Sequence, residues 1–464
     1  MSIYMACDIR GDAARELTPA LYQRWGLALG HRLPPRAKFV VGGDVRDSTP
    51  PFLAALVDGL CQAGLDVVDL GLLPTPMIYY AKQRLHADGC AIVTASHNPA
   101  PINGLKWMLG DRPPTPDDVA AMQRSEDEKV GDGRGRESTT PRSLDVSFDY
   151  VACLQEMFVA CLAVHRHVVL DPMHGCWAER ARRYLHAICP QCLFSTIHDT
   201  VDAHFGGRVP DCSRPRELAE LCEAVYRERA DLGIAFDGDG DRIALVDNEG
   251  VALSAEETTW VLLNCLGEEI RGERFVYDLK FSDRIAEAAR QFGAEPLRER
   301  SGHAFLRSRM CESGAVFGAE VSGHYFHRGL GGGDDGLYTA CLLIEHIARS
   351  NRTLAELRRA CPPVYMTPDL RISVAPEQQP AILETVQAAW SQFPQLLLDG
   401  VRIDTPGGWA LVRSSVTEPG MTFRFEGLDW HALEDLVERF CDTLPEFGDE
   451  LWMRYRAAMG SEGQ

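Results

Sequence analysis

The chain has 464 residues, of which 45% are hydrophobic and 25% are charged. This composition is typical of a globular protein, and the length predicts three or four domains, because a domain usually spans about 100–200 residues. With 67 acidic against 47 basic residues, the net charge is −20. Such a charge opposes binding to nucleic acid and to anionic membrane surfaces at long range. No apolar run approaches the ~20 residues that a membrane span requires.

The 15 cysteines lie mostly in apolar segments, and the N-terminal MSIYMACDIRG lacks the pattern of a secretion signal. Free, buried thiols are typical of a reducing compartment, so we expect a cytoplasmic protein. One Cys-x-x-Cys motif occurs, at Cys189 and Cys192. It has no second pair at the spacing of a zinc site and no redox-type βαβ unit around it, so the sequence by itself favours neither role.

The first part of the chain alternates between strand and helix patterns. Strands are expected at 38–44, 65–71 and 90–96, and helices at 49–64 and 77–85. This βαβαβ order predicts a parallel sheet with right-handed crossovers. The polar segment 125–145 follows, and we expect it to be a long loop or linker at a domain boundary.

The alternation then restarts twice and changes character near the C-terminus. Strands are expected at 167–171, 193–197, 230–236, 275–280, 294–300 and 314–320, and helices at 176–188, 214–229, 282–293, 303–313 and 331–350. A hairpin is expected to turn at 248–250. Beyond 362 the expected strands are 369–374, 400–405, 409–415 and 421–427, and the expected helices are 378–390 and 429–440. Strands that outnumber helices and short turns favour an antiparallel sheet there.

These patterns predict an α/β protein of four domains. Three similar α/β domains with mixed, mainly parallel sheets are expected at 1–145, 146–246 and 247–361, followed by a smaller α+β domain at 362–464. Ligands of open parallel sheets bind at the carboxyl ends of strands. The loops after the strands ending near Val93, Phe236 and Phe317 are therefore the places to search for chemistry.

The loop after Phe236 reads DGDGDR, with Asp237, Asp239 and Asp241 in alternation. In an extended loop, residues at i, i+2 and i+4 point to one side, so three carboxylates converge. They repel one another unless a divalent cation is bound, and hard oxygen ligands suit Mg²⁺ or Ca²⁺. An EF-hand is excluded, because Arg242 stands where Gly is required and a strand precedes the loop.

Two further polar loops could bind a phosphorylated ligand. Arg413, Ser415 and Thr417 lie between two strands of the last domain and can all donate to one phosphate, although an ordinary polar hairpin turn is the alternative. Glu320 and Ser322 could bind the hydroxyls of a polyol, and His324 could donate to phosphate, unless this is an ordinary strand end.

The glycine-rich stretch before the last helix of the third domain resembles a phosphate cradle. Asp334 and Asp335 would repel an anion there, so we expect them to cap that helix instead.

Ser96 follows the strand at 90–96 in the sequence TASHNP. A serine nucleophile of acyl transfer needs a base and an orienting acid, and the G-x-S-x-G pattern is absent. His97 is adjacent in sequence, so its side chain is expected to point elsewhere. A serine beside a Mg²⁺ site and a phosphate site fits phosphoryl transfer better.

With these motifs assembled, the sequence resembles the α-D-phosphohexomutase superfamily, the phosphomannomutase/phosphoglucomutase enzymes. The resemblance extends over nearly the whole chain and rests on DIRG at 8–11, TASHNP at 94–99, NGLK at 103–106, DGDGDR at 237–242, GAEVSGH at 318–324 and RSSVTEP at 413–419. It implies four domains around a central cleft, a phosphoryl group on Ser96, and Mg²⁺ held by Asp237, Asp239, Asp241 and that phosphate. By the same resemblance, the residues that line the active site are Arg10, Lys106, Arg242, Lys280 and His303. Glu320 and Ser322 match the sugar-binding loop, and Arg413, Ser415 and Thr417 match the phosphate clamp.

The resemblance implies interconversion of hexose 1-phosphate and hexose 6-phosphate, of mannose and/or glucose. Glucose 1,6-bisphosphate or mannose 1,6-bisphosphate would be the intermediate and activator. The expected partners are phosphosugars, with no nucleic acid or membrane, and the sequence leaves the oligomeric state open. Alternatives are a phosphoglucosamine mutase and a catalytically weak phosphosugar-binding relative. The latter stays open because Cys7 and Val416 depart from the Tyr and Asn common in the family.

Overall fold

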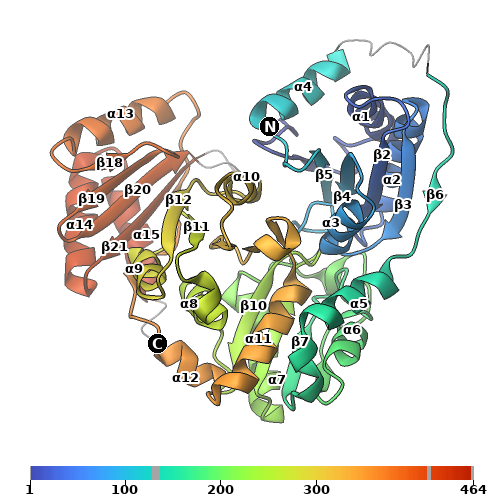
Figure 1. Ribbon diagram of the computed structural model, residues 1–464. Coiled ribbons are helices and arrows are strands. Elements are labelled where there is room, and N and C mark those ends of the chain that lie inside the picture. Colours follow the sequence, from blue (N-terminus) through green and yellow to red (C-terminus); the bar gives the residue numbers. More distant parts are fainter. Residues whose placement is uncertain (1, 128–135, 415–419, 461–464) are drawn as a thin grey trace. The chain divides into compact units, whose positions relative to one another are not determined.

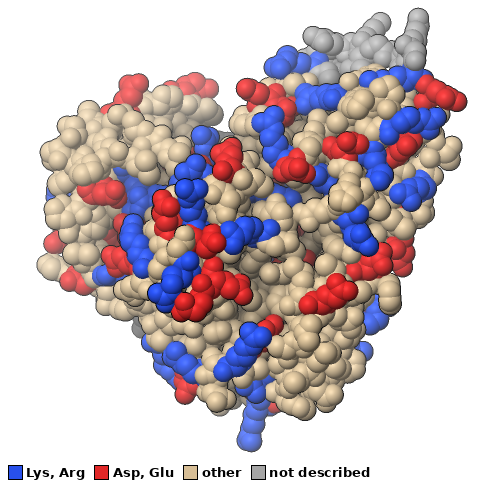
Figure 2. Space-filling model, viewed as in Figure 1, with Lys and Arg blue, Asp and Glu red and all other residues tan. Residues whose placement is uncertain are grey.

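The computed structural model of the protein describes residues 2–127, 136–414 and 420–460. The chain forms two compact units. The first comprises Met1–Tyr277, Ala289–Leu297 and Gly302–Cys361, and the second comprises Asp278–Ala288, Arg298–Ser301 and Pro362–Gln464. Within the described ranges, no helix is both long and apolar enough to cross a membrane. Acidic and basic side chains are interspersed over the face that Figure 2 shows.

The first sheet has six strands in the order β1-β5-β4-β2-β3-β6 (Figure 1). Its strands are β1 (Ile9–Asp12), β2 (Lys38–Gly43), β3 (Asp66–Leu72), β4 (Gly89–Val93), β5 (Ile102–Leu109) and β6 (Arg142–Ser143), and its helices are α1 (Pro19–His31), α2 (Thr49–Gln62), α3 (Thr75–Arg84) and α4 (Pro116–Asp127). As predicted, β2 is parallel to β3 and β4. The sheet is nevertheless mixed, because β5 returns antiparallel to β4 and pairs with β1.

Helices α1 and α2 pack closely on one another through two glycines. A Cβ atom on Gly59 would lie 2.0 Å from the carbonyl oxygen of Gln23, and one on Gly26 would lie 2.4 Å from that of Leu56. Real Cβ atoms do not approach other atoms so closely, so the packing of these two helices requires glycine at both positions.

The segment 125–145 is not all loop. Helix α4 extends through Asp127, and β6 pairs in parallel with β3, so part of this segment extends the first sheet. Residues 128–135 lie outside the described residues.

The second sheet has the order β10-β9-β7-β8. Its strands are β7 (His167–Asp171), β8 (Leu193–Thr196), β9 (Leu232–Phe236) and β10 (Ile243–Asp247), and its helices are α5 (Ser147–Met157), α6 (Ala181–Ile188) and α7 (Ala219–Glu228). Strand β7 is parallel to β8 and β9, whereas β10 is antiparallel to β9. The loop 237–242 is therefore the turn between two paired strands. Helix α6 begins five residues later than expected, after left-handed backbone at Glu179.

The third sheet has the order β12-β11-β13-β14-β15. Its strands are β11 (Arg274–Asp278), β12 (Glu295–Glu299), β13 (Phe317–Ala319), β14 (Tyr325–His327) and β15 (Gly333–Asp334), and its helices are α8 (Ala255–Leu266), α9 (Asp283–Gln291), α10 (His303–Ser313), α11 (Gly336–Ser350) and α12 (Leu354–Arg359). Helix α8 was not predicted, although Ser254 and Glu257 form a capping box at its start. Asp335 caps α11 as predicted by accepting from the backbone N–H groups of Leu337 and Tyr338.

The fourth sheet lies in the second unit and has the order β16-β21-β20-β19-β18, with β17 paired to β21. Its strands are β16 (Tyr365–Met366), β17 (Leu370–Ile372), β18 (Gln395–Leu396), β19 (Val401–Thr405), β20 (Gly408–Ser414) and β21 (Met421–Gly427), and its helices are α13 (Gln379–Ala389), α14 (Trp430–Thr443) and α15 (Gly448–Gly460). All of its pairings are antiparallel, as expected for an α+β domain. Trp390, Phe425 and Phe440 belong to its core.

We predict that His327 makes the first unit sensitive to acid. Its ring is 3% exposed and Nε2 lies 3.1 Å from the Thr339 hydroxyl, and burial lowers its pKa to about 3. Between about pH 6.5 and 3 only the unfolded chain protonates this histidine, so its contribution to the free energy of unfolding falls by about 1.4 kcal/mol per pH unit of acidification. Melting temperatures measured from pH 7 to 5 should therefore fall less steeply in His327→Gln. The exposed His431→Gln is the control, and equal slopes in all three proteins would contradict the prediction.

Candidate active site

Ser96 lies in the loop that follows β4, with its backbone in the left-handed region at φ 53°. Such a conformation is uncommon in a residue other than glycine and costs about 1–3 kcal/mol, so the surroundings must hold it. Its N–H donates to the Thr94 hydroxyl at 2.9 Å, and the buried guanidinium of Arg46 donates to its carbonyl oxygen at 3.0 Å. Arg46 is itself paired with Asp44. The serine is 1% exposed and its position is fixed by neighbours that the sequence analysis did not single out.

The acidic loop 237–242 lies against Ser96. The Ser96 hydroxyl donates to Asp237 at 2.9 Å. Carboxylate oxygens of Asp237, Asp239 and Asp241 lie within 4.8 Å of one another, and all three residues are at most 1% exposed. The structure thus brings the serine of the first domain and the three carboxylates of the second into one buried cluster.

Lys106 on β5 is the main counter-charge of this cluster. Its ammonium lies 2.9 Å from Asp239 and 2.8 Å from Asp241. Burial by itself would lower the pKa of Lys106, but the two carboxylates outweigh it and hold that pKa well above its ordinary value. Burial likewise would raise the pKa of Asp239, and the neighbouring ammonium keeps it below its ordinary value instead. Lys106 is therefore a fixed cation in this arrangement.

One lysine does not balance three carboxylates. Burial, followed by the charges of Asp241 and Asp239, raises the pKa of Asp237 well above its ordinary value. The Oδ1 atoms of Asp239 and Asp241 are buried and have no hydrogen-bond partner. Buried acceptors are normally paired, so unpaired carboxylate oxygens that converge are expected of cation ligands. These residues fit a divalent cation bound through hard oxygen donors.

A second set of side chains adjoins the acidic loop and is organised by Asp334. The Arg242 Nε–H donates to His324 Nε2 at 2.9 Å, and His324 Nδ1 lies 2.5 Å from Asp334. Asp334 also binds His303 Nε2 at 2.9 Å. The expectation that Asp334 caps α11 is therefore wrong. The side chain of Asp335 alone fills that position, which leaves Asp334 free to turn toward the two histidines.

Together with Asp241, the residues His303, His324 and Asp334 place ligand-type atoms within 4.8 Å of one another. Their ring nitrogens already face Asp334 and Arg242, so this set is better described as a hydrogen-bonded relay beside the three aspartates. Its members come from α10, the 320–324 turn and β15, and sequence spacing gives no signal that they meet.

Arg10 and His97 also lie close to Ser96 and its loop. Arg10 donates to Asp8 through Nε and to the Asn98 side chain through Nη1, both at 2.8 Å. His97 Nδ1 lies 3.4 Å from the Ser96 hydroxyl, so the expectation that its side chain points away is wrong. The left-handed backbone at Ser96 bends the chain and lets these two neighbouring side chains approach.

The turn 320–324 contacts the acidic loop directly. The Ile243 N–H donates to the Gly323 carbonyl oxygen at 3.1 Å, and Gly323 has φ 92°, where glycine is favoured. Glu320 Oε2 and Ser322 Oγ are buried and have no hydrogen-bond partner. These two free polar atoms at the end of β13 are suited to bind ligand hydroxyls.

The second unit carries the other predicted residues. Lys280 pairs with Asp369 at 3.1 Å, and Asp369 also pairs with Arg424 at 3.0 Å. Arg413, at the end of β20, is 7% exposed and lies 3.1 Å from Asp399. Ser415, Thr417 and the departure at Val416 lie outside the described residues.

Comparison with known families identifies the chain. Three models match it in order: phosphoglucomutase/phosphomannomutase alpha/beta/alpha domain I at residues 3–127, domain II at 149–250 and domain III at 255–365. The chain belongs to the phosphoglucomutase/phosphomannomutase family of the α-D-phosphohexomutase superfamily.

Individual relatives agree with this family. The phosphomannomutase/phosphoglucomutase of Pseudomonas aeruginosa is 32% identical over 449 residues, which cover 96% of this chain and 95% of that protein. A probable phosphoglucosamine mutase of Methanothermobacter thermautotrophicus is 34% identical over 437 residues, 92% of this chain and 94% of that protein. A family member from Burkholderia thailandensis has a solved structure that matches with TM-score 0.85 at 29% identity, covering 95% of this chain and 96% of that one.

We predict that a divalent cation stabilises the first unit through Asp237. Adding Mg²⁺ or Mn²⁺ to chelator-treated protein should raise the melting temperature, because the cation offsets the repulsion among the three carboxylates. In Asp237→Asn the shift should be lost, while the cation-free variant should melt no lower than wild type, since one buried charge is gone.

The matched control is Asp171→Asn, which alters a buried aspartate at the end of β7 outside the acidic cluster. It should keep the cation-dependent shift. A shift of wild-type size in Asp237→Asn would contradict the assignment.

Proposed function

We propose that this protein is a Mg²⁺-dependent phosphohexomutase that interconverts hexose 1-phosphates and hexose 6-phosphates through a phosphorylated Ser96. The observation that carries this proposal is the hydrogen bond between the Ser96 hydroxyl and Asp237, inside a buried aspartate cluster with unpaired ligand atoms. The names of the relatives support it, because they include phosphomannomutase/phosphoglucomutase, phosphoglucomutase and phosphomannomutase.

Phosphoryl transfer depends mainly on positioning and on neutralisation of charge. Bound Mg²⁺, held by Asp237, Asp239, Asp241 and the phosphoserine, would neutralise negative charge on the transferred group. The left-handed backbone at Ser96 aims its oxygen at the aspartates. Arg242 Nε lies 3.7 Å from Asp237 Oδ2, the oxygen that accepts from Ser96, and so adds positive charge beside that hydrogen bond.

The proton that leaves the sugar hydroxyl needs an acceptor. Lys106 is poorly suited, because two carboxylates hold its ammonium and raise its pKa. The imidazoles of His303 and His324, which Asp334 orients, and Arg10 beside the serine loop remain candidates for proton transfer and for binding the reacting phosphate.

Substrate recognition is assigned to two loops. Glu320 and Ser322 offer free buried oxygen atoms to sugar hydroxyls, and His324 follows in the same turn. Arg413, with Ser415, Thr417 and Lys280, would bind the phosphate that does not react. A bisphosphate formed at Ser96 would turn around, and this second phosphate site would then hold the opposite end.

We propose mannose and glucose phosphates as substrates, with glucose 1,6-bisphosphate or mannose 1,6-bisphosphate as intermediate and activator. A structural neighbour, an Aspergillus fumigatus N-acetylphosphoglucosamine mutase variant, was solved with glucose 1,6-bisphosphate. The second candidate is a phosphoglucosamine mutase, favoured by the relative from Methanothermobacter. The 15 cysteines are free, which supports a cytoplasmic location.

The decisive experiment is turnover. Wild-type protein with Mg²⁺ and a trace of glucose 1,6-bisphosphate should convert mannose 1-phosphate and glucose 1-phosphate to their 6-phosphates, and glucosamine 1-phosphate is the third arm. Preference for the third arm would select the alternative, and failure of all three would leave a phosphosugar-binding relative.

For Ser96→Ala we expect loss of turnover and of the phosphoryl group in the intact mass, because Ser96 supplies the hydroxyl that donates to Asp237. Thr94→Ser is the matched control, since it retains the hydroxyl that accepts from the Ser96 N–H. Turnover at the wild-type rate by Ser96→Ala would falsify the covalent route.

Arg413→Ala should raise KM for the sugar phosphate by more than about tenfold, since a guanidinium–phosphate pair supplies binding that alanine cannot replace. Phosphorylation of Ser96 should remain detectable by mass, because the serine and its neighbours belong to the first unit. Arg371→Ala, an exposed arginine of the same domain on β17, serves as the control. An unchanged KM in Arg413→Ala would remove the clamp assignment.

A further inference from the structure

The Cys-x-x-Cys motif forms a tight turn at the end of α6. Cys189 follows the last helical residue, and the N–H of Cys192 donates to the carbonyl oxygen of Cys189 at 3.1 Å. Pro190 and Gln191, the central residues of the turn, are exposed. Cys189 is 0% exposed and Cys192 is 5% exposed. The turn is thus at the protein surface, while its two side chains point inward.

This geometry suits a disulfide. A turn closed by a hydrogen bond between residues i and i+3 brings their Cα atoms within about 7 Å. Disulfides bridge Cα atoms about 4.4–6.8 Å apart. A third buried thiol, Cys161 in the short helix η1 (Val159–Ala163), also acts on Cys189. No large backbone movement is needed to bring the two sulfurs of the turn together.

The two thiols of the turn have different surroundings. The Cys192 thiol donates to the Val164 carbonyl oxygen at 3.2 Å, and the charge of Arg166 also acts on this sulfur. The hydrogen bond from Cys189 and the Arg166 charge lower the pKa of Cys192, against burial and Asp231, which raise it. Hydrogen bonds with Cys161 and Cys192, together with burial, raise the pKa of Cys189. Cys192 is therefore the thiol that ionises first, and the thiolate is the reactive form.

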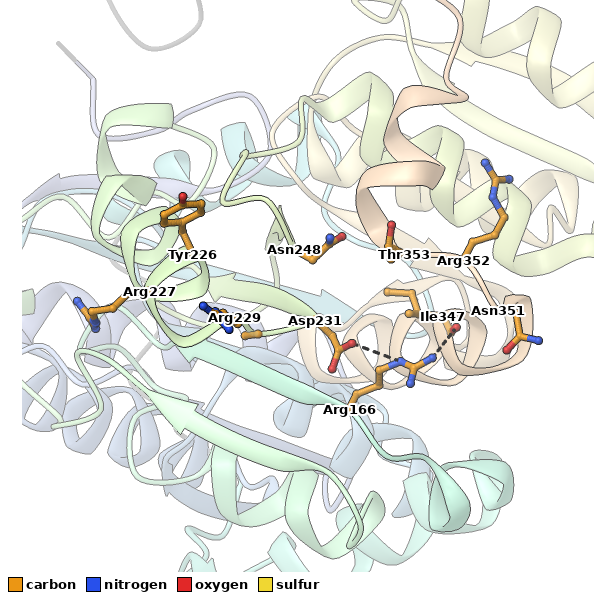
Figure 3. Close-up of a pocket in the computed structure, with 11 residues that line it drawn as sticks. Arg166, Tyr226, Arg227, Arg229, Asp231, Asn248, Ile347, Asn351, Arg352 and Thr353 are labelled. Atoms are coloured by element: carbon orange, nitrogen blue, oxygen red, sulfur yellow. Dashed lines mark hydrogen bonds and ion pairs between the residues drawn. The ribbon is translucent and has the colours of Figure 1, made fainter.

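Arg166, whose charge acts on this sulfur, lines a cavity. The cavity has a volume of about 710 Å³ and is also lined by residues of α7, α11 and the segment before α12 (Figure 3). The Arg166 guanidinium lies 3.9 Å from Asp231 and donates to the Ile347 carbonyl oxygen at 3.4 Å. Solvent and small solutes in this cavity come to the arginine whose charge acts on Cys192.

We propose that Cys189 and Cys192 form a redox-active dithiol that a peroxide converts to a reversible disulfide, at a site separate from the aspartate cluster. The Cys192 thiolate attacks the peroxide, gains one oxygen as a sulfenic acid and releases hydroxide. Cys189 then attacks the Cys192 sulfur, the S–O bond breaks, and water leaves with the proton of the Cys189 thiol. Two thiols are oxidised, one peroxide is reduced to two waters, and a dithiol reductant reverses the step.

The test uses the full chain, reduced and then treated with hydrogen peroxide at a small molar excess, quenched with N-ethylmaleimide and digested with trypsin. Residues 184–208 form one tryptic peptide that contains these two cysteines and no other. We expect this peptide to lose about 2 Da and to take up no N-ethylmaleimide. After reduction with dithiothreitol, each of its two thiols should take up N-ethylmaleimide again.

Two outcomes would overturn the proposal. One is a peptide 184–208 that retains both thiols when the exposed Cys311 is already oxidised, since exposure alone would then govern reactivity. The other is a cross-link between peptides 143–166 and 184–208, because a thiol of the turn would then pair with Cys153 or Cys161 rather than with its neighbour in the turn.

Variants distinguish the thiol that attacks the peroxide, Cys192, from the thiol that then closes the disulfide, Cys189. Cys192→Ser should slow the loss of thiols in the turn by about tenfold or more, because the thiolate is gone. Cys189→Ser should leave Cys192 to accumulate as a sulfenic acid that dimedone traps. Cys311→Ser is the control and should form the disulfide at the wild-type rate. Equal rates for Cys192→Ser and wild type would contradict the assignment of Cys192 as the attacking thiol.

Discussion

The rest of the candidate site depends on three buried carboxylates held a few ångströms apart. Asp237, Asp239 and Asp241 are almost entirely removed from water, and like charges in such surroundings repel strongly. Lys106 from the first domain and Arg242 from the loop itself supply positive charge beside these carboxylates. The remaining imbalance, and the unpaired oxygen atoms that go with it, are what a divalent cation would satisfy.

This cluster also explains how three domains share one site. The serine loop follows β4 of the first sheet, the acidic loop joins β9 and β10 of the second, and the 320–324 turn follows β13 of the third. Backbone contacts such as the hydrogen bond from Ile243 to Gly323 join the last two, and the Ser96 hydroxyl joins the first two. Each sheet contributes the end of a strand, where backbone groups are free and side chains converge.

The relay around Asp334 also holds charged and polar groups in fixed positions beside the aspartates. A carboxylate that binds two imidazoles fixes the orientation of both rings, and one of them faces the guanidinium of Arg242. Positions of charged groups are thereby set before any ligand arrives, which is the main requirement for phosphoryl transfer. The thiol turn at Cys189 and Cys192 belongs to another part of the second domain and obeys a different chemistry.

The sequence alone determined the alternation of strands and helices in the α/β domains, the antiparallel character of the last sheet, and the loops that carry Ser96, the three aspartates and Glu320. These follow from local periodicity and from residue types whose spacing already fixes the direction of their side chains. Several elements were not predicted from the sequence, among them α1, α5, β5 and α8. In β5, Asn103 and Lys106 interrupt the apolar pattern, whereas α8 does carry a capping box at its start.

Only the tertiary structure decided which charges meet. From the sequence, Asp334 and Asp335 were both expected to cap α11, because acidic residues before a helix are typical caps. His97 was expected to point away from Ser96, because adjacent side chains normally diverge. Both corrections arise from chain paths that local pattern does not encode: β15 brings Asp334 to the histidines, and the left-handed backbone at Ser96 folds His97 back. Contacts between residues more than a hundred positions apart, such as Lys106 with Asp239, depend on how separate sheets pack, and no spacing within one segment specifies them.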